Sequence, residues 1–307
     1  MVDPKERESS GKSSVDSEAA EVDGDLSASL AKRIQERFAS PAYQPPALPS
    51  VATKLLELSR ETDVEFKRIC EVLEQDQMLT GKVLARAQSA AYAGAAPTRT
   101  LHDALVRLGL GTIRNLVLEM AFNMTVFRAQ SYEKPMEVLR RHSLAVAYAA
   151  RLVARQTAVD AEYAFLCGLL HDVGVSAALI LLGAEPAASR PSIDQVWSSL
   201  PWIHEDLSGQ IVKLWKLPPE VQMVVGQHHR MHLGGHAHPV IAALRVAEGM
   251  AEALGLGLTN AEVANGYPFE KASHEEQAEA AVVLKLNLAT RDRIFAELEE
   301  LKPQLLE

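Results

Sequence analysis

The sequence predicts an all-α protein built as a helical bundle with two lobes. Apolar residues recur at the three- and four-residue spacing of a helix face in most segments of the chain. The alternation with a period of two that marks a strand is not sustained over any stretch. With 307 residues and a hydrophobic content of 48%, the chain can bury a sizeable core, and its length indicates two domains or lobes.

Charge, cysteine content and hydropathy narrow the class of protein. The net charge of −9 argues against a broad nucleic-acid-binding surface, so we expect no DNA partner. Cys70 and Cys167 lie in apolar helical patterns, and we interpret both as reduced core thiols of a cytoplasmic protein. The sequence shows no apolar region typical of a signal peptide, and no stretch approaches the roughly 20 apolar residues of a membrane span. We therefore expect no membrane span.

The N-terminal part of the chain is interpreted as a tail, a helix and a linker. Residues 1–25 are polar and acidic with few large apolar side chains, which predicts a disordered tail. Residues 26–44 combine an amphipathic helix, from Leu26 to Phe38, with a proline-rich linker. We expect the apolar face of this helix to contribute to binding a partner protein.

Residues 45–134 form the first predicted lobe, a succession of short helices. Residues suited to helix N-caps precede three of them: Thr62 or Asp63, Asp76, and Thr100. Gly109 and Gly111 interrupt the apolar pattern before a further helix that is expected over residues 112–127.

Residues 135–255 form the second predicted lobe, and residues 256–307 form a charged helical extension. The apolar spacing of the first helix of this lobe places His142 on its buried face. An apolar helix from Asp160 to Leu170 then ends in the pair His171-Asp172. Later helices are expected to begin near Ser192, His204, Pro218 or Pro219, and Pro239, with a histidine-rich loop before the last.

The pair His171-Asp172 is the centre of the candidate site. A buried carboxylate is unfavourable unless a metal ion or hydrogen bonds compensate it. Other histidines also fall on apolar faces, namely His142, His204, His228 and His229. One such histidine is more often a hydrogen-bonded core residue than a ligand, but the whole set predicts a shared pocket. Neutral imidazoles and carboxylates suit divalent transition ions.

Aromatic and basic side chains outside this set receive structural interpretations. The tryptophans Trp197, Trp202 and Trp215 are expected to pack in the core or between the lobes, because aromatic side chains bury large areas. Arg86, Arg99, Arg107 and Arg114 are interpreted as surface charges, with a phosphate-binding patch as the alternative.

Several ordered motifs together resemble the HDOD family, relatives of the HD phosphohydrolases. The resemblance covers about residues 45–255 and rests on the segments Leu48-Pro49-Ser50, Leu55-Leu56, Asp76-Gln77-Met78-Leu79-Thr80, Ala87-Gln88-Ser89-Ala90-Ala91-Tyr92, Ala104-Leu105-Val106-Arg107-Leu108-Gly109, His171-Asp172-Val173-Gly174, Trp215-Lys216-Leu217-Pro218 and His228-His229. It implies an all-helical fold with an HD-like second lobe and a regulatory or scaffolding role in bacterial signalling, usually without demonstrated catalysis.

The resemblance also implies a metal site, through the active HD phosphohydrolases. Their pattern of a histidine, a His-Asp pair, further histidines and a late aspartate falls here on His142, His171, Asp172, His204, His228, His229 and Glu248. Such residues would hold one or two ions of iron, manganese or zinc. Asp172 would bridge two ions and would be the catalytic residue of an active protein. Two ions can lower the pKa of a shared water, so that it becomes a hydroxide, and they can clamp a phosphoryl group.

Two departures from the active enzymes count against hydrolysis. Val175 stands where they commonly carry a lysine that would help to hold phosphate, and Glu248 is one methylene longer than aspartate. The tripeptide Gly266-Tyr267-Pro268 spells the signature of cyclic-di-GMP phosphodiesterases, but it lies away from the paired histidines and is interpreted as coincidence.

The sequence therefore predicts a non-catalytic, cytoplasmic signalling scaffold that binds other signalling proteins and retains a metal site. The alternative is a metal-dependent phosphohydrolase that acts on a nucleotide or a cyclic dinucleotide.

Overall fold

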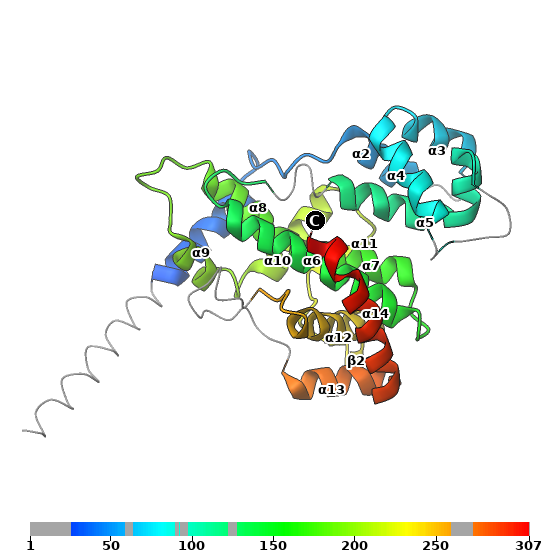
Figure 1. Cartoon of the computed structure of the whole chain (residues 1–307). Coiled ribbons are helices and arrows are strands. Elements are labelled where there is room, and N and C mark those ends of the chain that lie inside the picture. Colours follow the sequence, from blue (N-terminus) through cyan, green and yellow to red (C-terminus); the bar gives the residue numbers. More distant parts are fainter. Residues whose placement is uncertain are drawn as a thin grey trace, which may run out of the picture.

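The computed structural model describes residues 26–58, 64–89, 92, 98–121, 128–258 and 273–306. Within these ranges the protein is helical apart from one small two-stranded sheet (Figure 1). The predicted all-α class is thus confirmed. The predicted lobe boundaries at residues 45, 135 and 256 stay predictions, as does the disordered tail over residues 1–25, which lies outside the described residues.

The first helices of the described chain gather around α5. They are α2 (Ser50–Leu58), α3 (Phe66–Leu73), α4 (Gln77–Gln88) and α5 (Leu101–Ala121) (Figure 1). Each of the first three packs against α5, and the contact buries apolar side chains such as Leu55, Ile69 and Leu105. The burial of one apolar face per helix is what the helical spacing predicted.

The ends of these helices test the capping predictions. The Asp76 carboxylate accepts a hydrogen bond from the Leu79 N–H at 3.0 Å, which confirms the cap of α4. The predicted caps Thr62 and Asp63 lie outside the described residues, and Glu65 precedes α3. Gly109 has non-helical backbone, with φ of 76° and ψ of 160°, and it kinks α5 into two helical parts, which confirms the predicted interruption at this residue. The described part of α5 ends at Ala121, and the predicted continuation over residues 122–127 lies outside the described residues.

The remaining helices form the larger part of the molecule, with α6 at its centre. They are α6 (Glu133–Ala154), α7 (Ala161–Leu170), α8 (Val173–Gly183), α9 (Ile193–Ser199), α10 (His204–Leu214), α11 (Pro219–Val225), α12 (Pro239–Ala253), α13 (His274–Val283) and α14 (Leu288–Leu306). Helix α6 packs against α7, α12 and α14, while α8 packs against α10. The predicted cap Ser192 forms a complete capping box at the start of α9.

A short hairpin occupies the segment that was predicted as a histidine-rich loop. Strands β1 (His232–Leu233) and β2 (His236–Ala237) pair antiparallel, with Leu233 opposite His236. The two residues between them, Gly234 and Gly235, have φ of 59° and 83°. Two consecutive positive φ angles are those of a type I′ turn, for which a glycine pair is well suited.

The amphipathic helix near the N-terminus packs against the rest of the protein. Its described part covers residues 26–39, and Ile34 and Phe38 on its apolar face are 0% and 5% exposed. Arg37 on the same helix pairs with Glu185, which follows α8. The expectation that this apolar face is available to a partner was therefore wrong, because the protein itself covers the face.

Among the described residues, one stretch is long and apolar enough to cross a membrane, contrary to the expectation from the sequence. It runs over residues 161–183 and comprises α7 and α8, and 89% of its most apolar window is buried inside the protein. Burial of this kind is typical of core helices in water. We infer that the hydropathy of this stretch reflects its central position in the fold.

The tryptophans and Arg86 depart in part from their predicted roles. Trp197 is fully buried, and the indole N–H of Trp215 donates to the Pro46 carbonyl at 3.0 Å. Trp202 is 81% exposed, so its assignment to the core was wrong. Arg86 is not a free surface charge: it donates to the Tyr148 hydroxyl at 2.5 Å and thereby joins α4 to α6.

We predict that Gly174→Ala destabilises the protein because α8 and α10 meet at this glycine. A Cβ added there would lie 2.4 Å from the Ser208 nitrogen. Overpacking of this kind typically costs about 1–3 kcal/mol. The control is Gly81→Ala on α4, where an added Cβ meets nothing within 4 Å and removing a helical glycine should stabilise slightly. Urea denaturation of both variants checks the prediction, and equal effects would contradict it.

Candidate metal centre

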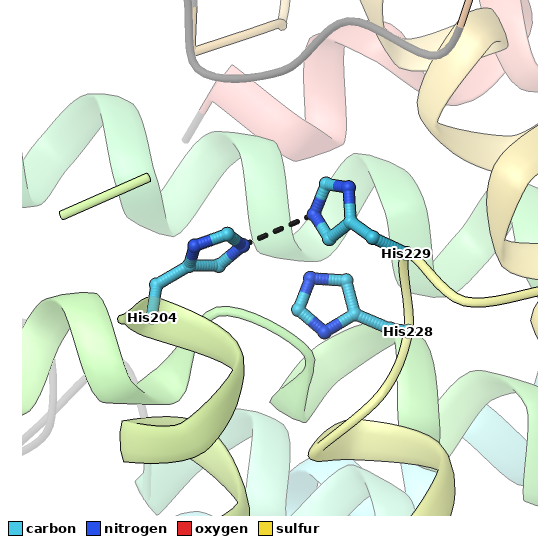
Figure 2. Close-up of side chains that lie close together, drawn as sticks. All are labelled: His204, His228 and His229. Carbon is cyan, nitrogen blue, oxygen red and sulfur yellow. Dashed lines mark hydrogen bonds between the residues drawn. The ribbon is translucent and has the colours of Figure 1, made fainter. Parts of the chain in front are cut away.

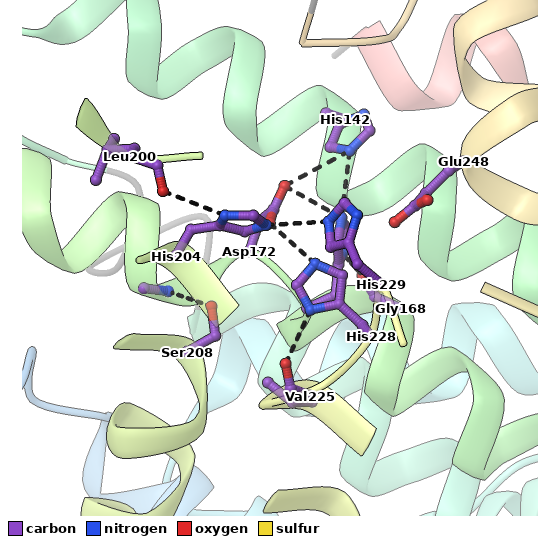
Figure 3. Close-up of polar contacts among 12 residues, drawn as sticks. His142, Gly168, Asp172, Leu200, His204, Ser208, Val225, His228, His229 and Glu248 are labelled. Atoms are coloured by element: carbon purple, nitrogen blue, oxygen red, sulfur yellow. Dashed lines mark hydrogen bonds and ion pairs between the residues drawn. The ribbon is translucent and has the colours of Figure 1, made fainter. Parts of the chain in front are cut away.

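The seven predicted ligand residues converge on one buried site (Figure 3). They come from distant parts of the chain: His142 from α6, His171 from the end of α7, Asp172 from the α7–α8 junction, His204 from the start of α10, His228 and His229 from the segment after α11, and Glu248 from α12. Their ligand atoms form overlapping groups of three, and within each group all atoms lie within 4.8 Å of one another.

Local sequence explains how the His-Asp pair reaches the centre. Helix α7 is apolar along its length and ends at His171, so the pair follows directly from a buried helix. The absent side chain of Gly174 then lets α8 approach α10 closely, and the Gly174 N–H donates to the Ser208 hydroxyl at 2.9 Å. This contact brings His204, the first residue of α10, to the Asp172 side chain.

The Asp172 carboxylate lies between two pairs of imidazoles. Its Oδ2 atom is 3.2 Å from His171 Nε2 and 3.8 Å from His142 Nε2. Its Oδ1 atom is 3.6 Å from His228 Nε2 and 3.8 Å from His204 Nε2. Each carboxylate oxygen therefore faces two ring nitrogens. Asp172 as a whole residue is 3% exposed, so the carboxylate is buried.

Backbone carbonyls hold these four rings in one orientation. The Nδ1 atoms of His142, His171, His204 and His228 contact the carbonyls of Leu256, Gly168, Pro201 and Val225 at 3.0, 2.8, 3.0 and 2.9 Å. Figure 3 shows the contact of His228 with Val225 and a second carbonyl contact of His204, with Leu200. A carbonyl can only accept, so each Nδ1 carries the proton. In the neutral ring the lone pair is then on Nε2, the atom that faces Asp172. This is the usual arrangement of histidine ligands around a metal.

Two polar atoms at the centre indicate that the site fits an ion. Asp172 Oδ1 and His228 Nε2 are buried, and neither finds a hydrogen-bond partner among the described residues. Their separation of 3.6 Å is too long for a hydrogen bond. Buried polar atoms without a partner are costly, and a divalent cation would satisfy both a carboxylate oxygen and an imidazole lone pair.

His229 and Glu248 share a further contact that the other ligands lack. Figure 2 shows His229 turned toward His204, with their Nε2 atoms 3.0 Å apart. On the other side of the ring, Arg245 Nη1 lies 2.9 Å from His229 Nδ1. The same Nη1 atom donates to the Glu248 carboxylate at 2.8 Å. A buried arginine from α12 thus contacts two of the seven predicted ligands.

The His-Asp pair carries opposite charges in the metal-free protein. Burial alone would raise the pKa of Asp172, but the adjacent charge and hydrogen bond of His171 hold that pKa well below its usual range. Burial would likewise lower the pKa of His171, but the Asp172 carboxylate outweighs burial and raises it to about 9. The pair is therefore an ion pair at neutral pH, and an ion that binds His171 must displace its proton.

The pKa values of His142, His204 and His229 are lowered, so these imidazoles are neutral at neutral pH. Burial, followed by the neighbouring His171, lowers the pKa of His142. Burial also lowers the pKa of His204, and it lowers that of His229 together with the surrounding histidines and Arg245. Neutral imidazole is the form that binds a metal, so these rings need lose no proton on metal binding.

Comparison of the sequence with models of known protein families identifies the family of this chain. The model of the HDOD domain matches residues 46–231, more than half of the chain. The chain belongs to the HDOD family. A curated relative, an uncharacterised protein of Treponema pallidum (strain Nichols), is 24% identical over 238 residues. That alignment covers 72% of this chain but only 43% of the relative, so the HDOD protein described here spans less than half of the relative's length.

Solved structures of low identity share the fold. A protein of Shewanella amazonensis SB2B, named "Putative metal-dependent phosphohydrolase", aligns with a TM-score of 0.71 at 21% identity and covers 92% of this chain and 100% of its own. An HDOD domain protein of unknown function from Geobacter sulfurreducens gives 0.61 at 20% identity, with 94% and 97% covered. A "Putative signal transduction protein" of Marinobacter aquaeolei VT8 gives 0.59 at 21% identity, with 92% and 64% covered.

One functional residue, Arg245, was missed by the sequence analysis. Only ligand types were sought there, and an arginine is not a metal ligand. The signal was nevertheless present, because Arg245 follows the apolar run Val240 to Leu244 in the helix that was predicted to begin near Pro239. A charged residue within such a run is rarely buried unless it is paired. The tripeptide Gly266-Tyr267-Pro268 lies outside the described residues.

We predict that the stability of the metal-free protein is greatest near pH 6.5–7. From about pH 6.5 up to about 9, native His171 holds a proton that the unfolded state releases, so stability falls as pH rises. Below about pH 6.5, the unfolded state binds protons that native His142, His204 and His229 do not bind, so stability falls as pH decreases. Thermal unfolding in EDTA across this range measures both slopes.

The variant Asp172→Asn tests the cause of the alkaline slope. Without the carboxylate, burial lowers the pKa of His171, and the loss of stability above about pH 6.5 should disappear. A slope that persists in this variant would show that another group carries it.

Proposed function

We propose that this HDOD protein binds one or two divalent transition-metal ions at the centre formed by Asp172 and its surrounding imidazoles. The observation that carries the proposal is the position of the Asp172 carboxylate, each of whose oxygens faces two Nε2 atoms at 3.2–3.8 Å. Iron, manganese and zinc all accept imidazole and carboxylate ligands.

The pairing around Asp172 supports a site for two ions. His142 and His171 face the Oδ2 atom of Asp172, and His204 and His228 face its Oδ1 atom. Glu248 has an oxygen close to ring nitrogens of His171 and His228 and is a further carboxylate ligand in the proposal. When bound, such ions would supply Lewis-acid chemistry and an activated water.

We further propose that the role of the protein is regulatory rather than catalytic. Val175, which stands where active relatives carry lysine, is fully buried in α8, so this position supplies no cation for phosphate. A fold shared with a signal-transduction protein agrees with signalling partners.

The alternative function is metal-dependent hydrolysis of a phosphodiester, such as a nucleotide or a cyclic dinucleotide. It is favoured by the convergence of the full set of seven predicted ligands, because a site that serves structure alone does not require a bridging carboxylate and so many imidazoles. In that case Asp172 would hold both ions, and this chain's imidazoles would fix their positions. A cytoplasmic location stays a prediction under either function.

Metal analysis of protein purified without chelator tests the proposal. We expect bound iron, manganese or zinc in the wild-type protein and its loss in Asp172→Ala, which removes the central carboxylate. Asp206→Ala, an exposed carboxylate on α10, is the matched control and should retain the metal. A wild-type protein that stays metal-free after incubation with each ion would refute the metal site.

Turnover of cyclic-di-GMP and of a generic phosphodiester by the metal-loaded protein separates the two functions. The regulatory function predicts no turnover. Turnover that Asp172→Ala abolishes and Asp206→Ala retains would establish the enzyme instead.

We also predict that metal binding strengthens with pH in the neutral range. The raised pKa of His171 means that its proton must leave below about pH 9, so affinity should rise by up to about tenfold per pH unit. Calorimetric titrations with zinc in buffers of different ionisation enthalpy measure the protons released. A release close to zero at pH 7 would contradict the charged state of His171.

A further inference from the structure

His229 differs from the other four imidazoles in what its Nδ1 atom contacts. Theirs donate to backbone carbonyls, whereas His229 Nδ1 faces the Arg245 guanidinium at 2.9 Å. An arginine has five N–H donors and no acceptor. His229 Nδ1 must therefore be the acceptor, and it carries no proton.

The proton of the neutral His229 ring is consequently on Nε2. That atom lies 3.0 Å from His204 Nε2, which is available as an acceptor because His204 Nδ1 donates to the carbonyls of Leu200 and Pro201. The hydrogen bonds thus run in one direction, from Arg245 to His229 to His204. In the metal-free protein each ring in this series has one donor and one acceptor, and both contacts are satisfied. An ion bound at His204 Nε2 would take the lone pair that accepts this hydrogen bond, and the His229 N–H would then turn to another acceptor.

We propose that His229 is not a metal ligand but a hydrogen-bond donor beside the metal, held in that role by Arg245, and that it binds an oxygen of an oxyanion such as phosphate. A ring nitrogen that carries a proton has no lone pair for an ion. An N–H group at the edge of a cationic site suits an anionic oxygen. The inference rests on the proposed metal site and assigns a different task to one of its seven residues.

Arg245 is a positioning residue in this proposal, and its surroundings keep it in place. The residue is 2% exposed, and it donates to Glu248 at 2.8 Å and to Glu276 of α13 at 2.9 Å. The two carboxylates compensate the buried guanidinium, which would otherwise be costly. Because the charge is compensated, Arg245 acts on His229 chiefly through the direction of one hydrogen bond.

Metal content separates a ligand from a donor. We expect His229→Gln to retain at least about half of the wild-type metal after dialysis, whereas its neighbour His228→Gln should lose more than about nine-tenths, because losing a ligand typically costs several kcal/mol of binding. Equal losses in the two variants would overturn the proposal.

The tautomer of His229 tests the role of Arg245 without any metal. In protein labelled with ¹⁵N-histidine and treated with EDTA, His229 should be the ring with a protonated Nε2 and an unprotonated Nδ1, assigned by its loss in His229→Gln. Arg245→Met should change this signature, and Arg245→Lys, which keeps a donor, should restore it. A protonated Nδ1 in the wild-type protein would refute the proposal.

Phosphate binding to the metal-loaded protein tests the ligand. Inorganic phosphate should bind His229→Gln about tenfold more weakly than it binds the wild type, the change expected for one lost hydrogen bond to a charged group. Equal affinities, or no binding by the wild type, would contradict the oxyanion role. A wild type without metal would instead reject the metal site, while the tautomer would still decide whether Arg245 fixes His229.

Discussion

The burial of the Asp172 carboxylate is the constraint on which the centre depends. A charge in a dry interior is unfavourable by several kcal/mol unless the surroundings compensate it. Here the compensation comes from rings carried by α6, α7, α10 and the segment after α11, all of which must be packed before the carboxylate is satisfied. The tertiary structure and the electrostatics of the site therefore form together, and neither can be altered alone.

The imidazoles around this carboxylate divide into two kinds, and the group that contacts Nδ1 decides which kind each ring belongs to. Where a carbonyl faces Nδ1, the ring offers a lone pair toward Asp172. Where Arg245 faces Nδ1, the ring offers a proton instead. Two neighbouring residues of identical type, His228 and His229, thus have opposite chemistry in one site. The tautomer of each ring is set by the group that contacts its Nδ1 atom, and the types of the site residues alone do not reveal that group.

The sequence indicated most of the helices and a set of residues that lie together in the structure, but not the role of each residue. Apolar spacing located α6 and placed His142 on its buried face, because one-sided burial leaves a periodic trace. It could not indicate the Arg245–His229 contact, which joins residues whose side chains meet only after α12 has packed. The sequence also did not indicate that Trp202 is exposed. The size of a tryptophan favours burial, but Trp202 lies in the loop before α10, where its side chain faces solvent. The helix over residues 26–39 was recognised, yet amphipathicity alone does not reveal which surface it covers.

The HDOD match ends at residue 231, but residues that complete the centre lie beyond it. The carbonyl that orients His142 belongs to Leu256, the cation behind His229 is Arg245, and one of that cation's counter-charges is Glu276 on α13. The segment matched by the HDOD model is therefore smaller than the unit that must fold to complete the chemistry. An excised fragment cut at the edge of the match would keep five imidazoles and Asp172 but would leave two of those rings without the partners that set their protons.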